Sequence, residues 1–247
     1  MANAYNQLRA LCEDPPADLV DYFDKFPIAD YSDSAIGLLP LEGAIAMSAD
    51  FRRFHPLAVA FGLVFLDDAN TSDHHCYITR SPLAGCILYL AHDGDTTVVF
   101  EGLDKYLRAM KFARDAETRF DELYHDEHRP IARVTAPNQD ALARTMRELL
   151  RDERDEKAVV QLVVCISALD LSDLALLESL ARHSDMYVVE ALGNAIARSP
   201  RPGLMDIAMK VSEHDQFQAA SAGKRAIAAI KAEPKATADG GRDTGFS

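Results

Sequence analysis

Acidic and histidine side chains gather in one short stretch, and these residue types bind divalent metal ions or transfer protons. The stretch contains Asp67, Asp68, Asp73, His74 and His75. Carboxylates and imidazoles suit such ions, but the glycine and the glutamate at the sixth and twelfth places of an EF-hand calcium loop are absent. Adjacent histidines on a strand also point to opposite faces. We therefore predict no metal site and no cofactor.

A second charged group, made of His92, Asp93, Gly94 and Asp95, offers an acid and a base side by side. It lies between two apolar runs, where an Asp-Gly pair favours the tight turn of a hairpin because glycine tolerates a positive φ. Paired-carboxylate catalysis would also need a cleft that holds both groups at a fixed separation. We interpret the group as a turn.

Known catalytic signatures are absent from the sequence. It contains no Gly-x-Ser-x-Gly elbow, no Walker loop, no glycine-rich dinucleotide turn and no His-Glu-x-x-His helix. Cys12, Cys76, Cys86 and Cys165 are too widely spaced for a zinc knuckle or a dense disulfide framework. We predict that they are reduced and buried, and that the protein is not an enzyme.

The charge balance excludes one class of partner. The 39 acidic residues against 26 basic ones give a net charge of −13, which opposes sustained contact with a phosphate backbone. No apolar run approaches the roughly 20 residues of a spanning helix, and the first residues lack the pattern of a secretory signal. We expect no nucleic-acid partner, no membrane contact and a cytoplasmic location.

One stretch in the front half of the chain has acidic residues with almost no basic ones. Between residues 61 and 101 the only basic residue is Arg80. A hairpin at 92–95 and the loop after Leu66 would form a negative rim if they lie at one end of a sheet. Such a rim attracts a basic protein and raises its association rate. The predicted partner-binding residues are Asp67, Asp68, Asp73, Asp93, Asp95 and Glu101.

Short apolar runs broken by turn residues must position these acids. The runs are rich in β-branched and aromatic residues and predict strands; they cover 44–47, 61–66, 76–79, 86–91 and 96–100. Run 86–91 has almost no polar alternation, which predicts a central strand that is covered on both faces. Helical periodicity precedes the strands at 4–12 and 17–26 and follows them at 101–113. The front half is therefore predicted to be an α+β domain with a mixed or antiparallel sheet and flanking helices.

The rear half contains an internal repeat of 30 residues. Asp155, Asp185 and Asp215 each open a helical run, as N-cap residues do. The apolar positions of these runs recur in step, at Val159, Val189 and Ala219, at Leu162, Leu192 and Ala222, and at Ile166, Ile196 and Ala226. The intervening helices also match, Leu174 with Leu204 and Leu177 with Ile207. The region resembles HEAT-like repeats, in which helix pairs stack into a curved all-α array.

The front half resembles the SUKH superfamily. The resemblance rests on the order of a buried strand, an acidic turn, a second apolar strand, a His-Asp-Gly hairpin and a closing amphipathic helix; these are residues 61–68, 76–79, 85–90, 92–95 and 100–107. It implies an α+β protein-binding module. Many bacterial members are similar to immunity proteins that neutralise toxins from neighbouring cells, and a fungal branch regulates cell-wall synthesis. The tryptophan that is often seen in the family is absent here.

These inferences combine into one hypothesis. The chain is predicted to comprise a SUKH-like domain (1–113), a charged helical connection (114–136), HEAT-like repeats (137–232) and a disordered tail (233–247). Its predicted function is that of a protein-binding module, an immunity-type protein that neutralises a basic toxin or effector. The alternatives are a scaffold that docks through its repeats, and a metal-dependent enzyme that uses Asp67, Asp73, His74, His75 or His92.

Overall fold

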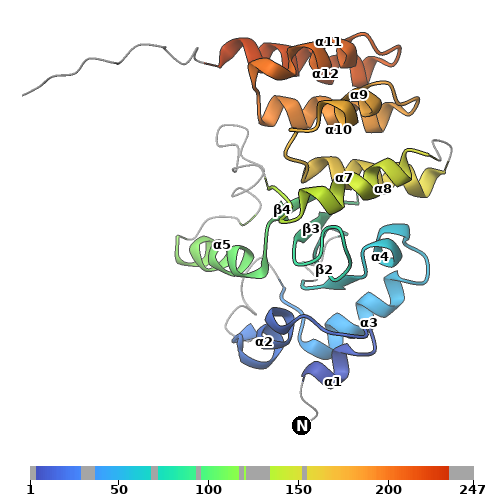
Figure 1. Cartoon of the computed structure of the whole chain (residues 1–247). Coiled ribbons are helices and arrows are strands. Elements are labelled where there is room, and N and C mark those ends of the chain that lie inside the picture. The colour runs from blue at the N-terminus through green and yellow to red at the C-terminus, as the bar shows by residue number, and fades with distance from the viewer. Residues whose placement is uncertain are drawn as a thin grey trace, which may run out of the picture.

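The computed structural model of the chain describes residues 4–28, 37–67, 72–92, 96–116, 120, 134–151 and 155–233. A four-stranded sheet with helices on both faces is followed by stacked helices (Figure 1). This confirms the predicted α+β fold with a helical C-terminal region. Most of the predicted connection 114–136, and the predicted tail except Glu233, lie outside the described residues.

The sheet is an antiparallel meander in the order β1-β2-β3-β4. Its strands are β1 (Leu63–Phe65), β2 (His74–Ile78), β3 (Ile87–Leu90) and β4 (Thr97–Phe100). Four of the five predicted strand runs are confirmed. β3 lies inside the sheet and all its side chains are buried except half-buried Tyr89, as the central-strand prediction requires.

The fifth run, residues 44–47, was predicted as a strand and is wrong. These residues belong to α3 (Leu41–Phe51), which lies beside β1. A run of four apolar residues has the same pattern in a strand and in a buried helix turn, so the pattern alone does not distinguish them. The buried positions Ala44 and Ser48 are four residues apart, which is the spacing of a helix face.

The two faces of the sheet contact different helices. One face carries Leu63, Phe65, Cys76, Ile78, Leu88, Leu90 and Val98. These side chains pack in one cluster with α4 (Pro56–Ala60), α7 (Gln139–Leu149) and α8 (Glu156–Ser167). The opposite face packs Val64, Leu66, Tyr77 and Ile87 against α1 (Ala4–Leu8), α2 (Ala17–Lys25) and α5 (Leu103–Asp115). The sheet is therefore enclosed by helices on both faces.

A serine from a neighbouring helix accepts a backbone hydrogen bond from each edge strand of the sheet. The backbone N–H of Phe65 in β1 donates to Ser48 Oγ of α3 at 3.0 Å, and the N–H of Val98 in β4 donates to Ser167 Oγ of α8 at 3.0 Å. Both serines are buried. An edge strand otherwise presents unpaired N–H groups, so the two serines satisfy a buried donor at each edge.

The cysteines are free, as predicted, and Cys76, Cys86 and Cys165 are buried while Cys12 is half-buried. Burial raises the pKa of the Cys165 thiol to about 12 and that of Cys86 to about 11. Both thiols therefore stay protonated at neutral pH and pack as small apolar side chains.

Three helix pairs form the rear half, and they stack away from the sheet (Figure 1). The first pair is α7 with α8; the second is α9 (Leu174–Ala181) with α10 (Met186–Arg198); the third is α11 (Met205–Ser212) with α12 (Phe217–Ala232). Eight of the nine predicted recurring positions in α8, α10 and α12 are buried, including Leu162, Leu192 and Ala222, and Ile166, Ile196 and Ala226, whereas Val159 is half-buried. The repeat is thus confirmed in its packing.

The helix starts do not keep strictly to the 30-residue spacing. Asp155 and Asp185 cap α8 and α10, each accepting a backbone N–H at 2.9 Å. Asp215 does not cap α12, because that helix begins one residue later and Gln216 takes the cap position without a side-chain hydrogen bond. The predicted match of Leu174 with Leu204 fails by the same shift: Leu174 is 52% exposed, whereas Leu204 is buried and precedes α11.

The two halves pack together without a break. One cluster of buried apolar side chains runs from α4 through the sheet and α8 to α12. The predicted boundary at 114–136 therefore separates the halves in sequence but not in the core. In the part of the chain that the structure describes, each helix is too short or too polar to cross a bilayer.

Candidate functional site

The predicted acidic rim is not assembled by the acids whose positions are described. Asp68, Asp93 and Asp95 lie outside the described residues. Asp67 is fully buried, so its carboxylate cannot belong to an exposed rim, which corrects that part of the prediction. Glu101 is half-buried and forms an ion pair with Lys105 one helical turn away.

Asp67 instead holds a buried hydrogen-bond network. Its Oδ1 accepts the backbone N–H of His75 at 2.8 Å, and its Oδ2 lies 2.5 Å from His75 Nδ1 and 3.4 Å from the Tyr106 hydroxyl. An ionised carboxylate only accepts hydrogen bonds, so we assign the proton to Nδ1. The network joins the end of β1 to β2 and α5.

An aspartate that holds the Nδ1–H of a histidine is also the arrangement that orients a general base. Here the imidazole of His75 is only 6% exposed and lies among aromatic rings, 5.1 Å from Phe120 and 5.5 Å from Tyr106 between centroids. Burial raises the pKa of Tyr22 well above its ordinary value, and the negative charge of the nearby Asp67 raises it further. The imidazole is thus almost closed to solvent, and we interpret the network as an internal cross-link.

His74 faces the opposite side of the sheet, as predicted. Its ring packs edge-on against Phe51 and Phe65, at 5.6 Å and 5.1 Å between centroids. The two histidines therefore cannot bind one ion together. Within the described ranges, His, Cys, Asp and Glu side chains form no group of three or more that could hold a metal.

Asp73 stabilises the start of the β3–β4 turn. Its carboxylate accepts the backbone N–H of His92 at 2.7 Å and the hydroxyl of Tyr89 at 3.0 Å. The hydrogen bond from His92, assisted by the one from Tyr89, lowers the pKa of Asp73. The ionised carboxylate is therefore favoured in the folded state.

Replacing Asp73 with alanine should destabilise the protein in a pH-dependent way. A pKa that is lower in the folded state contributes stability above the unfolded value of about 3.9, and this contribution is lost as the pH falls through the folded value. In urea unfolding between pH 3 and pH 6, the loss caused by Asp73→Ala should be largest near pH 6 and shrink towards pH 3. Ser72→Ala, an exposed neighbour that does not titrate, should show no such trend. An equal loss at both ends of the range would contradict this assignment.

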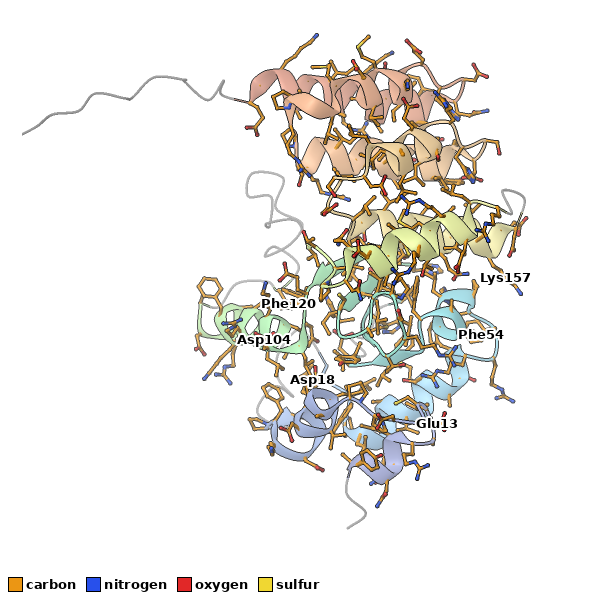
Figure 2. The ribbon with its side chains drawn as sticks, in the orientation of Figure 1. Glu13, Asp18, Phe54, Asp104, Phe120 and Lys157 are labelled. Atoms are coloured by element: carbon orange, nitrogen blue, oxygen red, sulfur yellow. The ribbon has the colours of Figure 1, made fainter. Side chains whose placement is uncertain are left out.

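An exposed groove lies between the α3–α4 turn and the first turns of α8. It has a volume of about 510 Å³. Three apolar side chains in it are open to solvent: Phe54 is 65% exposed, Val59 50% and Val160 37%. Figure 2 shows Phe54 and Lys157 on the same side of the molecule, one on each wall of this groove.

Positive charge surrounds the groove. Arg52, Arg53 and Lys157 line it, and Arg80 donates to the backbone carbonyl of Val59 at 2.6 Å. Burial lowers the pKa of Arg52, and the like charge of Arg80 lowers it further. This gathering contrasts with the net charge of −13 for the whole chain. The run from Arg52 to His55, which combines two arginines with a phenylalanine, was the sequence signal for the groove.

Further apolar side chains are exposed along the helix stack. Tyr187 near the start of α10 is 56% exposed, and Phe217 at the start of α12 is 81% exposed. Helices α8, α10 and α12 all begin on the same side of the molecule (Figure 1). Val160, Tyr187 and Phe217 lie at or near the first turns of these three helices, and we call these three exposed side chains the exposed apolar row.

Comparisons with models of protein families, with curated proteins and with solved structures find no match to this chain. The resemblance to SUKH domains therefore stays a prediction. The fold itself is the finding: a helix-covered antiparallel sheet that continues into stacked helix pairs.

Proposed function

We propose that the chain is a protein-binding module of the immunity type, which binds a toxin or effector in the cytoplasm and neutralises it. The observation that carries this proposal is the exposed apolar row of Val160, Tyr187 and Phe217. Exposed apolar patches mark interaction sites, and aromatic side chains dominate the binding energy of protein interfaces. The row lies along stacked helices, which offer extended surfaces to partners.

The support of the row is rigid, and this also favours binding. α10 packs against both α8 and α12. Gly193 and Gly223 allow the helices to approach so closely that a Cβ atom at either position would lie under 3.0 Å from its neighbours. A preformed surface loses less conformational entropy when a partner binds. The net charge of −13 further favours fast association with a basic partner, and the SUKH-like features imply the same class of function.

The metal-dependent alternative has weaker support. It would draw its metal ligands or its acid and base from Asp67, Asp73, His74, His75 or His92. Asp67 and His75 bind each other in the core, and His74 lies on the other face of the sheet. Asp73 is engaged with His92 through the backbone rather than through its imidazole.

Coexpression tests the proposal. Genes adjacent to the one that encodes this chain are expressed singly in a heterologous host, with and without the chain. We expect one neighbour to stop growth alone, to be tolerated with the chain, and to form a stable complex with it in size-exclusion chromatography. The double variant Tyr187→Ala/Phe217→Ala should weaken that complex at least about tenfold, because aromatic anchors carry most interface energy.

The matched control is Leu174→Ala, since Leu174 is 52% exposed on the other layer of the stack. It should leave growth and the complex unchanged. If each neighbouring gene is harmless, or if a toxic one remains toxic in the presence of the chain, the immunity function is refuted.

A further inference from the structure

We propose that the groove between α4 and α8 binds an acidic segment of a partner protein, with one apolar side chain of the segment seated on Phe54, Val59 and Val160. This inference goes beyond the proposed function: the groove shares Val160 with the exposed apolar row, but Tyr187 and Phe217 lie outside it. The groove carries the charge opposite to that of the chain as a whole, so it selects a different ligand from the basic partner that the net charge favours.

The floor of the groove is built to accept an apolar side chain. Phe54, Pro56 and Val59 come from the α3–α4 turn and α4, and Val160 comes from α8. Its volume of about 510 Å³ lies within the range of about 300 to 1,000 Å³ that is typical of ligand sites. Phe54, which is exposed in this floor, offers a large apolar area that a bound side chain would remove from water.

The rim of the groove selects negative charge. Lys157 forms no ion pair with any residue that the structure describes. Arg53 has a side chain that is 81% exposed and lies 3.7 Å from Asp50, and such exposed pairs are weak. Both cations are therefore available to carboxylates of a ligand. Glu156 is the single acid among the groove residues.

Two further arginines, Arg52 and Arg80, add to the positive field of the groove. Arg52 donates to the backbone carbonyls of Leu11 and of Leu63, the latter at 3.3 Å, and Arg80 donates to Val59. Carbonyl acceptors orient these guanidinium groups without neutralising their charge. Walls of low dielectric constant focus such a field on the groove. The groove is thus preformed, positive and apolar at once.

This combination fits an acidic peptide better than other anions. A nucleic acid would bring its phosphates close to a chain of net charge −13, and binding to a phosphate backbone depends on an extended basic face. A small inorganic anion would gain nothing from Phe54 and Val160. A peptide segment with carboxylates on both sides of one apolar side chain uses the rim and the floor together.

Fluorescence anisotropy with a defined probe tests the inference on the full-length chain. The probe is a labelled peptide of sequence Glu-Asp-Glu-Phe-Leu-Glu-Asp-Glu. One comparison peptide replaces every acid with lysine, and the other replaces Phe-Leu with Gly-Ser. We expect saturable binding of the acidic apolar probe, and binding at least about tenfold weaker for both comparison peptides. Added salt should weaken binding of the probe.

Variants locate the binding site. Phe54→Ala should remove the apolar contact and Lys157→Glu should reverse the rim charge, and each should weaken probe binding at least about tenfold. The matched controls are Phe112→Ala and Lys111→Glu on α5, both exposed and on a different side of the molecule from α8 (Figure 1). They should leave the affinity unchanged within about twofold. Circular dichroism confirms that each variant is folded.

Several results would overturn the inference. Equal binding of the lysine peptide, or equal affinity in the Phe54→Ala variant, would show that the groove does not select the probe. A dimer in sedimentation velocity that Phe54→Ala dissociates would assign the groove to a second copy of this chain. Binding to vesicles of phosphatidylserine, with none to the probe, would assign it to a lipid surface. The coexpression experiment is independent of these outcomes, because its variants lie on α10 and α12.

Discussion

Replacing Asp67 with alanine is expected to lower the free energy of unfolding by about 3 to 5 kcal/mol, because each of two buried donors that lose their acceptor costs about 1 to 3 kcal/mol. The substitution leaves the backbone N–H and the Nδ1–H of His75 buried without their acceptor. For a chain of this size, each kcal/mol lowers the melting temperature by about 2 to 4 °C. Calorimetry should therefore show a decrease of roughly 6 to 20 °C.

Two other variants show whether the network is the cause. Asp67→Asn keeps one carbonyl acceptor, and the imidazole can move its proton to Nε2 and accept from the new amide, so the loss should be smaller than for alanine. Asp104→Ala removes an exposed carboxylate whose ion pair with Arg108 is mostly in solvent, and its effect should be far smaller. A melting temperature for Asp67→Ala as high as that for Asp104→Ala would refute the role of the network.

Replacing Gly223 with alanine should cost about 2 kcal/mol, although alanine is the better helix former. A Cβ atom at this position would lie 2.3 Å from the backbone nitrogen of Ser212 and 2.6 Å from its Cα. Helix α11 would have to move away from α12, and such overpacking costs about 1 to 3 kcal/mol and occasionally more. The gain in helix propensity is only about 1 kcal/mol, so the clash should make the substitution destabilising overall.

Gly43→Ala is the matched control, because Gly43 also lies inside a helix, α3. A Cβ atom there would approach only side-chain atoms, the nearest at 3.4 Å. This variant should be as stable as the original chain or slightly more stable. Urea unfolding of both variants measures the difference. A Gly223→Ala protein that unfolds at the same urea concentration as Gly43→Ala would contradict the close approach of α11 and α12.

Much of the fold could be predicted from local patterns. The apolar runs that became β1 to β4 are bounded by turn residues, and the helices of the rear half repeat apolar residues at spacings of three and four. The strand prediction for residues 44–47 failed because four residues are too few to distinguish the period of a helix from that of a strand. The prediction that Asp215 caps a helix failed because α12 begins at Phe217, one residue later than the 30-residue spacing requires.

The candidate sites depend on contacts that no local pattern contains. Asp67 is adjacent to another aspartate and resembles a turn residue, and only the pairing of Phe65 with Cys76 brings it beside His75. Phe54 follows two arginines, but its exposure is decided by how α4 meets α8. Sequence alone predicted which residues could do chemistry, whereas tertiary packing decided which of them are accessible.

The two serine-capped edges limit how this protein can associate with copies of itself. Open sheet edges recruit strands from other molecules, and this recruitment begins fibril growth in many proteins. Here Ser48 and Ser167 occupy a donor of each edge strand, and their helices lie beside those strands. An incoming strand would first have to displace α3 or α8. Helix α8, which carries Val160 of the exposed apolar row, thus also protects one edge of the sheet from aggregation.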